Sequence, residues 1–311
     1  MSKKNDSIEE LLKNGLMKYG SDKSLLFDRV AFGIESLDKL VGGGIPKKRM
    51  SLFTGPPSSG KSYLASQAVV SEQKNGGVAA WIDTELSWDP VWMERCGVDI
   101  DKIYLVQPTT GEEAFDTIKV LMNEKVGVIV LDSIAGIVPT AVQEEDFSYN
   151  PVAWQARFVN QSIPKLFPSL KNGSALIVIN QVRSSLGPVS LDNMPGGVAQ
   201  QFFAHFILQI RREGWIEDAD KNKMGFDIKI SCKKSKVGGQ PYQSCTVPFR
   251  LEGGIDLLET VIREALDKGI IEQARAWFKW GDLKVIGMKG VKEYLINNPD
   301  KKLELESLIK E

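Results

Sequence analysis

Residues 55–62 read GPPSSGKS, between the apolar run RMSLFT (49–54) and the helix-forming stretch YLASQAVV (63–70). The octet fits the phosphate-binding loop pattern G-x-x-x-x-G-K-S without a mismatch. Glycines let backbone N–H groups turn inward around a polyphosphate, and the following helix adds its positive N-terminal end. A Gly/Ser turn that holds a lysine by chance is the alternative, but a strand before and a helix after favour a site for ATP or GTP.

The last residues of such a loop have distinct roles. Lys61 would reach the β- and γ-phosphates, and the Ser62 hydroxyl would hold Mg²⁺. The residues expected to line the nucleotide at the loop are Gly55, Pro56, Pro57, Ser58, Ser59, Gly60, Lys61, Ser62 and Tyr63.

Composition limits what the nucleotide could serve. The 311 residues are 42% hydrophobic and 25% charged, which is ordinary for a folded soluble protein. No apolar run approaches the ~18 residues of a membrane span, and the N-terminus lacks the apolar core of a secretory signal. Cys96, Cys232 and Cys245 are scattered, so no zinc site or disulfide framework is expected and a reducing cytosol fits best. Because the net charge is −1, any nucleic-acid site must be local.

Apolar runs alternate with helix-like segments from about residue 31 to 253. Near-continuous apolar runs are typical of strands buried on both faces of a parallel sheet. Helices are expected at 111–124 and 152–163. The pattern predicts an α/β core with a mixed, mainly parallel central sheet. The strands expected are 49–55, 77–85, 102–108, 126–133 and 174–181, followed by 202–212, 225–234 and 244–252 as an antiparallel extension.

Two smaller segments flank this core. Residues 1–30 are expected to form an N-terminal arm, in which Ser7 and Glu10 make a capping box for a short helix. An isolated helix of this length is marginal, so it needs a packing partner, such as a neighbouring subunit. Residues 254–311 begin with the amphipathic stretch 255–268 and are expected to form a small α/β lobe that ends in a polar helix.

Acidic residues stand where strands of the core end. Asp132 ends an apolar strand, where a carboxylate could hold Mg²⁺ or cap the next turn. Glu85 lies just past another strand and could orient or deprotonate an attacking water, although acids in one loop are usually a solvated turn. Asp89 follows in the same loop. Trp92 could stack on a base, with a core tryptophan as the plainer interpretation.

Three further stretches carry weaker signals. Gln181 ends a buried strand and could sense the γ-phosphate. The loop 184–197 holds two prolines and three glycines without periodicity and is long enough to be functional or disordered. The cluster KKSK (233–236) is basic, but such clusters are usually solvated.

Together these residues resemble the bacterial RecA recombinase family, including its phage-encoded relatives. The resemblance covers roughly residues 8–310, and several of its segments together are highly specific. It rests on segments that include SLDKLVGGGIP, GPPSSGKS, WIDTELSWDP, VIVLDSIAGIVP, VINQVR, PGGVAQQFFAHFILQIRR, KKSKVGGQP and IDLLETVIREALDKGIIEQARAWF.

The resemblance implies a DNA-dependent ATPase that forms helical filaments on single-stranded DNA and exchanges strands with a homologous duplex. ATP and Mg²⁺ would lie between subunits. By position, Glu85 corresponds to the catalytic glutamate, Asp132 to the Mg²⁺ aspartate and Gln181 to the γ-phosphate sensor. Trp92 corresponds to the adenine-stacking aromatic, and Asp89 is counted with it among the nucleotide contacts.

Other correspondences point to a subunit interface. Lys234 and Lys236 correspond to lysines that reach the γ-phosphate from the next subunit, as an arginine finger does in trans. They are counted with Lys61 among the catalytic candidates. Phe202 corresponds to an aromatic residue that links the nucleotide across the interface, with simple packing as the alternative.

Two loops carry DNA in this family, and they correspond here to about 143–152 and to 182–197. The arginines would contact phosphates, and the apolar residues would wedge between nucleotide triplets. The residues expected to contact DNA are Val152, Arg157, Arg183, Leu186, Gly196 and Gly197.

The chain departs from the family at several points that bear on DNA binding rather than on the ATPase. The second DNA loop is about two residues shorter, Ser185 replaces a common lysine, and Pro164 replaces an arginine. A proline inside that helix would cost about 3 kcal/mol unless the helix kinks. No acidic tail precedes the end at Glu311, which is expected to ease access to duplex DNA because like charge no longer repels it.

Three functions are therefore weighed. The first is a strand-exchange recombinase. The second is a RecA-like paralogue that assembles with ATP as a regulatory or assembly ATPase but exchanges no strands, which the thinner set of basic residues in the DNA loops favours. The third is a hexameric helicase or related motor, which the C-terminal lobe and KKSKVGGQP oppose.

Overall fold

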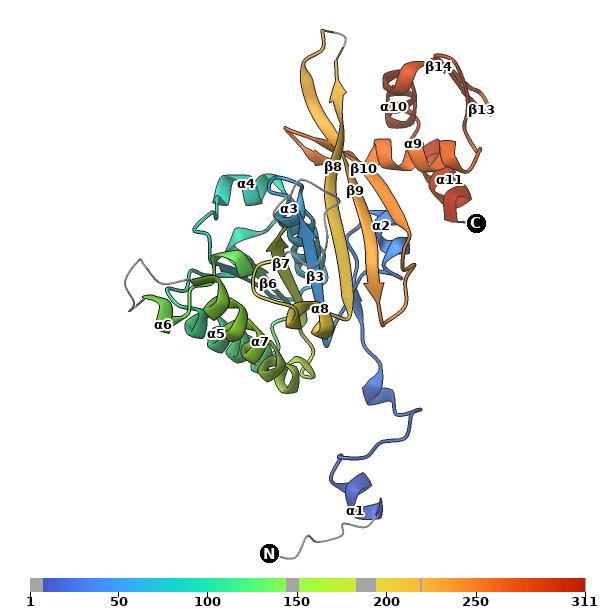
Figure 1. The fold of residues 1–311 in the computed structure, drawn as a ribbon. Helices are drawn as coiled ribbons and strands as arrows, with labels where there is room; N and C mark the ends of the chain where they lie inside the picture. The colour runs from blue at the N-terminus through green and yellow to red at the C-terminus, as the bar shows by residue number, and fades with distance from the viewer. Residues whose placement is uncertain (1–7, 144–150, 183–193, 219, 311) are drawn as a thin grey trace, which may run out of the picture.

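The computed structural model describes residues 8–143, 151–182, 194–218 and 220–310. Its centre is a nine-stranded sheet with the order β11-β10-β9-β8-β3-β7-β6-β4-β5 (Figure 1). The predicted α/β class is confirmed, and the strand that precedes the phosphate-binding loop, β3, lies in the middle of the sheet. The strands are β3 (Arg49–Gly55), β4 (Ala79–Asp83), β5 (Ile103–Val106), β6 (Val128–Asp132), β7 (Ala175–Gln181), β8 (Phe206–Glu217), β9 (Lys223–Ser235), β10 (Ser244–Arg250) and β11 (Gly254–Ile255).

The direction of pairing changes at β8. Strands β5, β4, β6, β7, β3 and β8 are parallel, and β9, β10 and β11 continue in antiparallel pairing. The mixed sheet is therefore confirmed, but the prediction of one strand over 202–212 is wrong. Phe202 and Phe203 belong to helix α8 (Ala199–Phe203), and β8 pairs in parallel with β3. A short apolar run is compatible with a buried helix as well as with a strand, so its pattern alone does not distinguish them.

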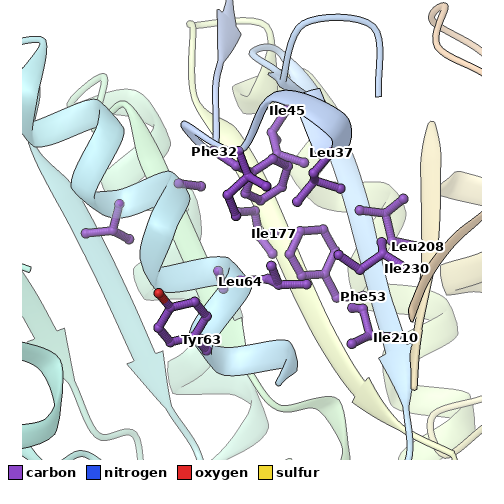
Figure 2. Packing of buried hydrophobic residues seen from close by; sticks show 14 of the residues in the cluster. Phe32, Leu37, Ile45, Phe53, Tyr63, Leu64, Ile177, Leu208, Ile210 and Ile230 are labelled. Atoms are coloured by element: carbon purple, nitrogen blue, oxygen red, sulfur yellow. The ribbon is translucent and has the colours of Figure 1, made fainter. Parts of the chain in front are cut away.

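Helices cover both faces of the parallel strands, because alternate side chains of a strand point to opposite faces. Phe53 and Ile177 pack in one buried cluster with Leu64 of α3 (Figure 2). Leu52 and Val178, their neighbours in sequence, pack in a second cluster with side chains of α5 and α7. Burial on both faces explains why these strands are almost entirely apolar. The helices of the core are α2 (Glu35–Leu40), α3 (Lys61–Lys74), α4 (Pro90–Arg95), α5 (Gly111–Asn123), α6 (Thr140–Gln143), α7 (Pro151–Leu170) and α8.

Helix α7 runs through two prolines and does not end at residue 163 as the sequence suggests. Pro164 and Pro168 both lie inside it. A proline has no N–H, so the carbonyls of Asn160 and Pro164 receive no bond from the residue four places on. The burial of Leu166 and Leu170 in the second apolar cluster offsets this loss.

The N-terminal segment extends away from the core (Figure 1). It contains α1 (Ile8–Lys13) and a 3₁₀ turn at Lys23–Leu25, and a ribbon of β1 (Arg29–Val30) and β2 (Ile45–Pro46) joins it to the core. Ser7, half of the predicted capping box, lies outside the described residues. Ile8 and other apolar side chains of this segment are exposed.

The residues after β11 form a small lobe with its own apolar cluster. An ionic cluster joins the lobe to the sheet: Glu259, which is 3% exposed, contacts Arg250, Arg263 and Lys292. Cations on all sides satisfy a carboxylate that would be costly to bury alone. No helix in the described ranges is long and apolar enough to cross a membrane. The lobe consists of α9 (Leu257–Asp267), β12 (Glu272–Ala274), β13 (Trp277–Trp280), β14 (Leu283–Ile286), α10 (Gly287–Asn297) and α11 (Pro299–Lys310).

Candidate active site

The phosphate-binding loop joins β3 to α3 and needs glycine at both conserved positions of its pattern. A Cβ on Gly55 would lie 2.0 Å from the carbonyl oxygen of Ile210 in β8. Gly60 is the N-cap of α3 with φ of 94°, and a Cβ there would lie 2.7 Å from Cδ1 of Ile228. A side chain at Gly55 would therefore displace the backbone of β8, and one at Gly60 would be strained by the left-handed backbone and crowd the Ile228 side chain. The result is a helix N-terminus that opens at the carboxyl edge of the sheet.

Lys61 opens α3 and is folded against its own loop. Its ammonium donates to the carbonyls of Gly55 at 3.1 Å and Pro56 at 2.7 Å, and the residue is 6% exposed. Burial lowers the pKa of Lys61, and the carboxylates of Asp132 and Glu85 act in the opposite direction. A cation held in this way lies within the loop that the sequence predicts for phosphates.

Ser62 and Asp132 form the pair predicted for Mg²⁺. The Ser62 hydroxyl donates to Oδ2 of Asp132 at 2.7 Å. Burial raises the pKa of Asp132 to about 6, while the Ser62 hydrogen bond lowers it and the Glu85 charge raises it further. Hydroxyl and carboxylate oxygens are ligands that Mg²⁺ prefers, and its charge would stabilise this buried carboxylate, so the pair fits the ion. No group of three or more His, Cys, Asp or Glu side chains placed to hold a metal occurs among the described residues, so phosphates and water would complete the coordination.

Glu85, in the loop after β4, and Gln181, the last residue of β7, meet directly. The Gln181 amide donates to Oε1 of Glu85 at 2.8 Å, and the Ser133 hydroxyl donates to the same oxygen at 2.5 Å. Ser133 follows Asp132, so one segment of chain carries both the metal candidate and a hydrogen-bond donor to Glu85. Two donors on one oxygen hold the carboxylate of an otherwise exposed side chain in place.

The three acids of the loop after β4 differ in environment. Asp83 is fully buried and accepts bonds from the backbone N–H groups of Glu85, Ser87 and Trp88, so it shapes the loop. Asp89 caps α4 by accepting from the N–H groups of residues 91 and 92. Glu85 alone directs its carboxylate to the Ser133–Gln181 pair. The loop is therefore more than a solvated turn.

A cavity of about 510 Å³ opens beside the phosphate-binding loop. Trp92 of α4 lines it and also packs partly against the apolar core, and its stacking on a base stays a prediction. The sequence did not indicate that Arg212, Trp215 and Lys223 of the β8–β9 hairpin also line the cavity. Ser133 was missed as well, although its position directly after Asp132 was a usable signal.

Lys234 and Lys236 lie elsewhere in the same chain. Lys234 pairs with Ile207 of β8, toward the opposite end of the sheet from the loop. Its ammonium donates to the carbonyls of Gln201 at 2.5 Å and Phe202 at 3.1 Å, and Lys236 donates to Phe202 at 3.4 Å. Burial, followed by the charge of Lys236, lowers the pKa of Lys234. Phe202 itself is 69% exposed. One chain therefore does not bring these residues to its own phosphate-binding loop.

The DNA candidates are described only in part. Arg183, Leu186 and the side chain of Val152 lie outside the described residues, as do most of both loops. Arg157 lies on α7, with its guanidinium carbon 5.8 Å from the ring of Trp154.

Two glycines sit where the second DNA loop returns to the core. Gly196 and Gly197 have φ of 79° and 74°. A Cβ on Gly196 would lie 2.5 Å from Ile134, near Asp132 in sequence. Nearby, Asn180 donates to Gln200 of α8 at 2.8 Å, so the strand that ends in Gln181 is tied to the helix that carries Phe202.

Known proteins match the chain over nearly its whole length. The family described as RecA N-terminal domain matches residues 3–256. Protein RecA of Thermus aquaticus is 33% identical over 309 residues, which cover 97% of this chain and 91% of that protein. Protein RecA of Clostridium novyi is 35% identical over 305 residues, which cover 96% and 87%. Protein RecA of Aquifex pyrophilus is 33% identical over 312 residues, which cover 98% and 89%.

Proposed function

Since this chain belongs to the bacterial RecA family, we propose that it is an ATP-dependent recombination protein that forms helical filaments on single-stranded DNA and exchanges strands with a homologous duplex. One observation carries the proposal. Within one chain Lys61, Ser62, Asp132, Glu85 and Gln181 converge at the carboxyl edge of the sheet. That edge is where open α/β sheets bind their ligands. In the cell we place this activity in the cytoplasm.

The side chains of the site divide the work of hydrolysis. The loop N–H groups and Lys61 would bind the phosphates of ATP, and Ser62 and Asp132 would hold Mg²⁺. When bound, Mg²⁺ neutralises charge on the β- and γ-phosphate oxygens. Glu85 would orient the attacking water and accept its proton, because Ser133 and Gln181 fix one of its oxygens. Gln181 would then respond to the γ-phosphate.

A second subunit would complete this site. Lys234 and Lys236 lie away from their own loop, beside the exposed Phe202. In a head-to-tail filament they would reach the γ-phosphate bound by a neighbour and stabilise charge in the transition state. Hydrolysis would then depend on filament assembly. We assign residues 1–30 to polymerisation, 31–253 to the ATPase core and 254–311 to the C-terminal domain.

DNA would bind through a few local contacts, since the net charge is −1. We propose that Arg157 and Arg183 contact phosphates, that Val152 and Leu186 separate nucleotides, and that the segment beginning at Gly196 returns the loop to the core. Pro164 within α7 stands where the family has an arginine, so this chain has one cation fewer for binding DNA. This difference supports a second function, a RecA-like assembly ATPase that exchanges no strands.

The test is ATP hydrolysis by the purified protein with and without single-stranded DNA. We expect DNA to raise the rate strongly, and Glu85→Gln to abolish the increase while ATP still binds. Glu94→Gln, an exposed acid on α4, is the matched control and should behave as wild type. A rate indifferent to DNA would overturn the recombinase proposal and leave the assembly ATPase.

A further inference from the structure

We propose that the β8–β9 hairpin of this chain is a wall of the nucleotide pocket, with Arg212, Trp215 and Lys223 packing against the base and ribose of a nucleoside triphosphate. The inference rests on the proposed function, which it deepens. The cavity beside the loop is lined by Ser58 to Tyr63, by Trp92 and by side chains of the hairpin. Phosphates held at the loop would therefore place a nucleoside in a cavity that both Trp92 and the hairpin line.

An irregularity in the strand pairing aims the hairpin at the cavity. Residues three apart on a regular strand point to opposite faces. The register of β8 against β9 shifts between Arg212 and Trp215, and the Arg212 guanidinium carbon lies 4.6 Å from the centre of the Trp215 ring. The Lys223 ammonium lies 4.3 Å from the same centre. A bulge of this kind turns side chains toward a site, and here it gathers two cations on one ring.

Aromatic contacts join this wall to the phosphate-binding helix. Trp215 packs on Phe226, Phe226 on Phe249, and Phe249 on Tyr63, with ring centres 6.0, 5.0 and 5.0 Å apart. Tyr63 follows Ser62 on α3, and its hydroxyl accepts a bond from the N–H of Ile255 at 2.9 Å. The wall is thus continuous with the helix whose N-terminus would meet the phosphates.

The two cations of the wall contact the Trp215 ring and are not paired with a described carboxylate. No ion pair to Arg212 or Lys223 occurs within the part of the chain that the structure describes. Trp215 is 41% exposed. Guanidinium groups and indole rings both stack on nucleobases, and the positive charge suits a site beside a polyphosphate. These groups would recognise the nucleoside, whereas Lys61 recognises the phosphates.

The test separates nucleoside from phosphate. The dissociation constants of ATP and inorganic tripolyphosphate are measured with the full chain by competition against a fluorescent ATP analogue, without DNA. Trp215→Ala should weaken ATP roughly tenfold, as expected for the loss of one stacking contact, and leave tripolyphosphate unchanged. Arg212→Gln, an exposed change that spares the fold, should weaken ATP roughly threefold. Trp215→Phe should restore most of the ATP affinity.

The control is Trp277→Ala in the C-terminal lobe. Trp277 is also 41% exposed and has the Lys284 ammonium 5.6 Å from its ring centre, so it matches Trp215 in setting but not in place. Unchanged ATP affinity in both hairpin variants would overturn the wall. Equal weakening of ATP and tripolyphosphate would also overturn it, because Trp215 would then act through the phosphate-binding helix. If the wild type bound no ATP, the proposed function would fail first.

Discussion

The two ends of the central sheet hold opposite halves of the candidate machinery. At the carboxyl edge of β3, β6 and β7, acids and one lysine converge within one chain, and burial raises the pKa of Asp132. At the other end, Lys234 and Lys236 gather beside α8 with Arg49 and His205, and burial and neighbouring cations lower the pKa of Lys234 and His205.

The distance between the ends explains this division. Lys234 pairs with Ile207, which pairs with Leu52 of β3, three residues before Gly55. Three residues of strand span about 10 Å before the loop begins. The Lys234 ammonium, which donates to the carbonyls of Gln201 and Phe202, therefore lies away from its own loop, and we propose that it would act on a phosphate bound by a neighbouring subunit.

The largest effect is expected for Lys61, which should be needed for ATP binding by the DNA-free chain, whereas Lys234 and Lys236 should not. Lys61→Ala should lower ATP hydrolysis on the order of 1,000-fold and weaken ATP binding by the DNA-free chain, because it removes a buried cation from the phosphates. Lys74→Ala, at the exposed end of the same helix, is the control. A chain with both Lys234→Ala and Lys236→Ala should bind ATP normally when DNA is absent. Lost binding in that chain would break the comparison.

Mixing two inactive variants tests whether the halves meet between subunits. Glu85→Gln and the double variant of Lys234 and Lys236 should each lose DNA-dependent hydrolysis, by about 100-fold or more. In mixed filaments roughly one interface in four pairs an intact Glu85 with intact lysines, so activity should partly return. Lys233→Ala, on the exposed face of β9, should not impair hydrolysis. A mixture no more active than its parts would mean that the lysines do not act in trans.

A smaller effect on hydrolysis is expected for Ser133, and it tests whether Ser133 positions the Glu85 carboxylate. Ser133→Ala removes one donor from the Glu85 carboxylate, and a hydrogen bond to a charged group contributes enough that kcat should fall roughly tenfold. ATP binding should not change, because Ser133 does not line the cavity at the loop. The measurement is steady-state hydrolysis with saturating DNA. A change in KM without a change in kcat would show that Ser133 positions the nucleotide and not Glu85.

The sequence predicts the carboxyl edge of the sheet better than it predicts helices α7 and α8 or the β8–β9 hairpin, and the reasons are physical. The loop needs Gly55 and Gly60 because atoms of β8 and β9 occupy the positions that their Cβ atoms would take. Both glycines belong to one pattern of eight adjacent residues, so the sequence alone reveals the loop. The parallel strands can be predicted from sequence because burial on both faces makes them continuous apolar runs. Spacing alone could not bring Glu85 to Gln181, which lie 96 positions apart, and only the family resemblance linked them.

Features that depend on long-range packing were missed. The predicted strand 202–212 includes Phe202 and Phe203, the last two residues of helix α8, because a short apolar pair fits either form. Helix α7 passes Pro164 because the buried face beyond it holds the chain in place. The wall formed by Arg212 and Trp215 depends on a shift of register between two strands, and no local pattern marks a shift of register.

The smallest expected effect is a difference in pH dependence between the two ends. His205 is the only histidine of the chain, and burial together with the charges of nearby cations lowers its pKa to about 4. As the pH falls below about 6.5, the unfolded chain binds this proton first, so His205 makes the folded state less stable until the pH reaches about 4. Asp132 acts in the opposite sense: its folded pKa of about 6 exceeds the ordinary aspartate value of 3.8, so the folded chain binds that proton first and gains stability.

Urea unfolding of the nucleotide-free chain at about pH 7 and about pH 5 measures both contributions. His205→Asn keeps an acceptor near the N–H of Met50 but removes the titration, so it should gain stability relative to wild type on acidification. Asp132→Asn should lose stability relative to wild type over the same interval. Parallel pH profiles for wild type and both variants would show that the two ends do not differ in their proton linkage, and the electrostatic half of the comparison would fail while the positional half stood.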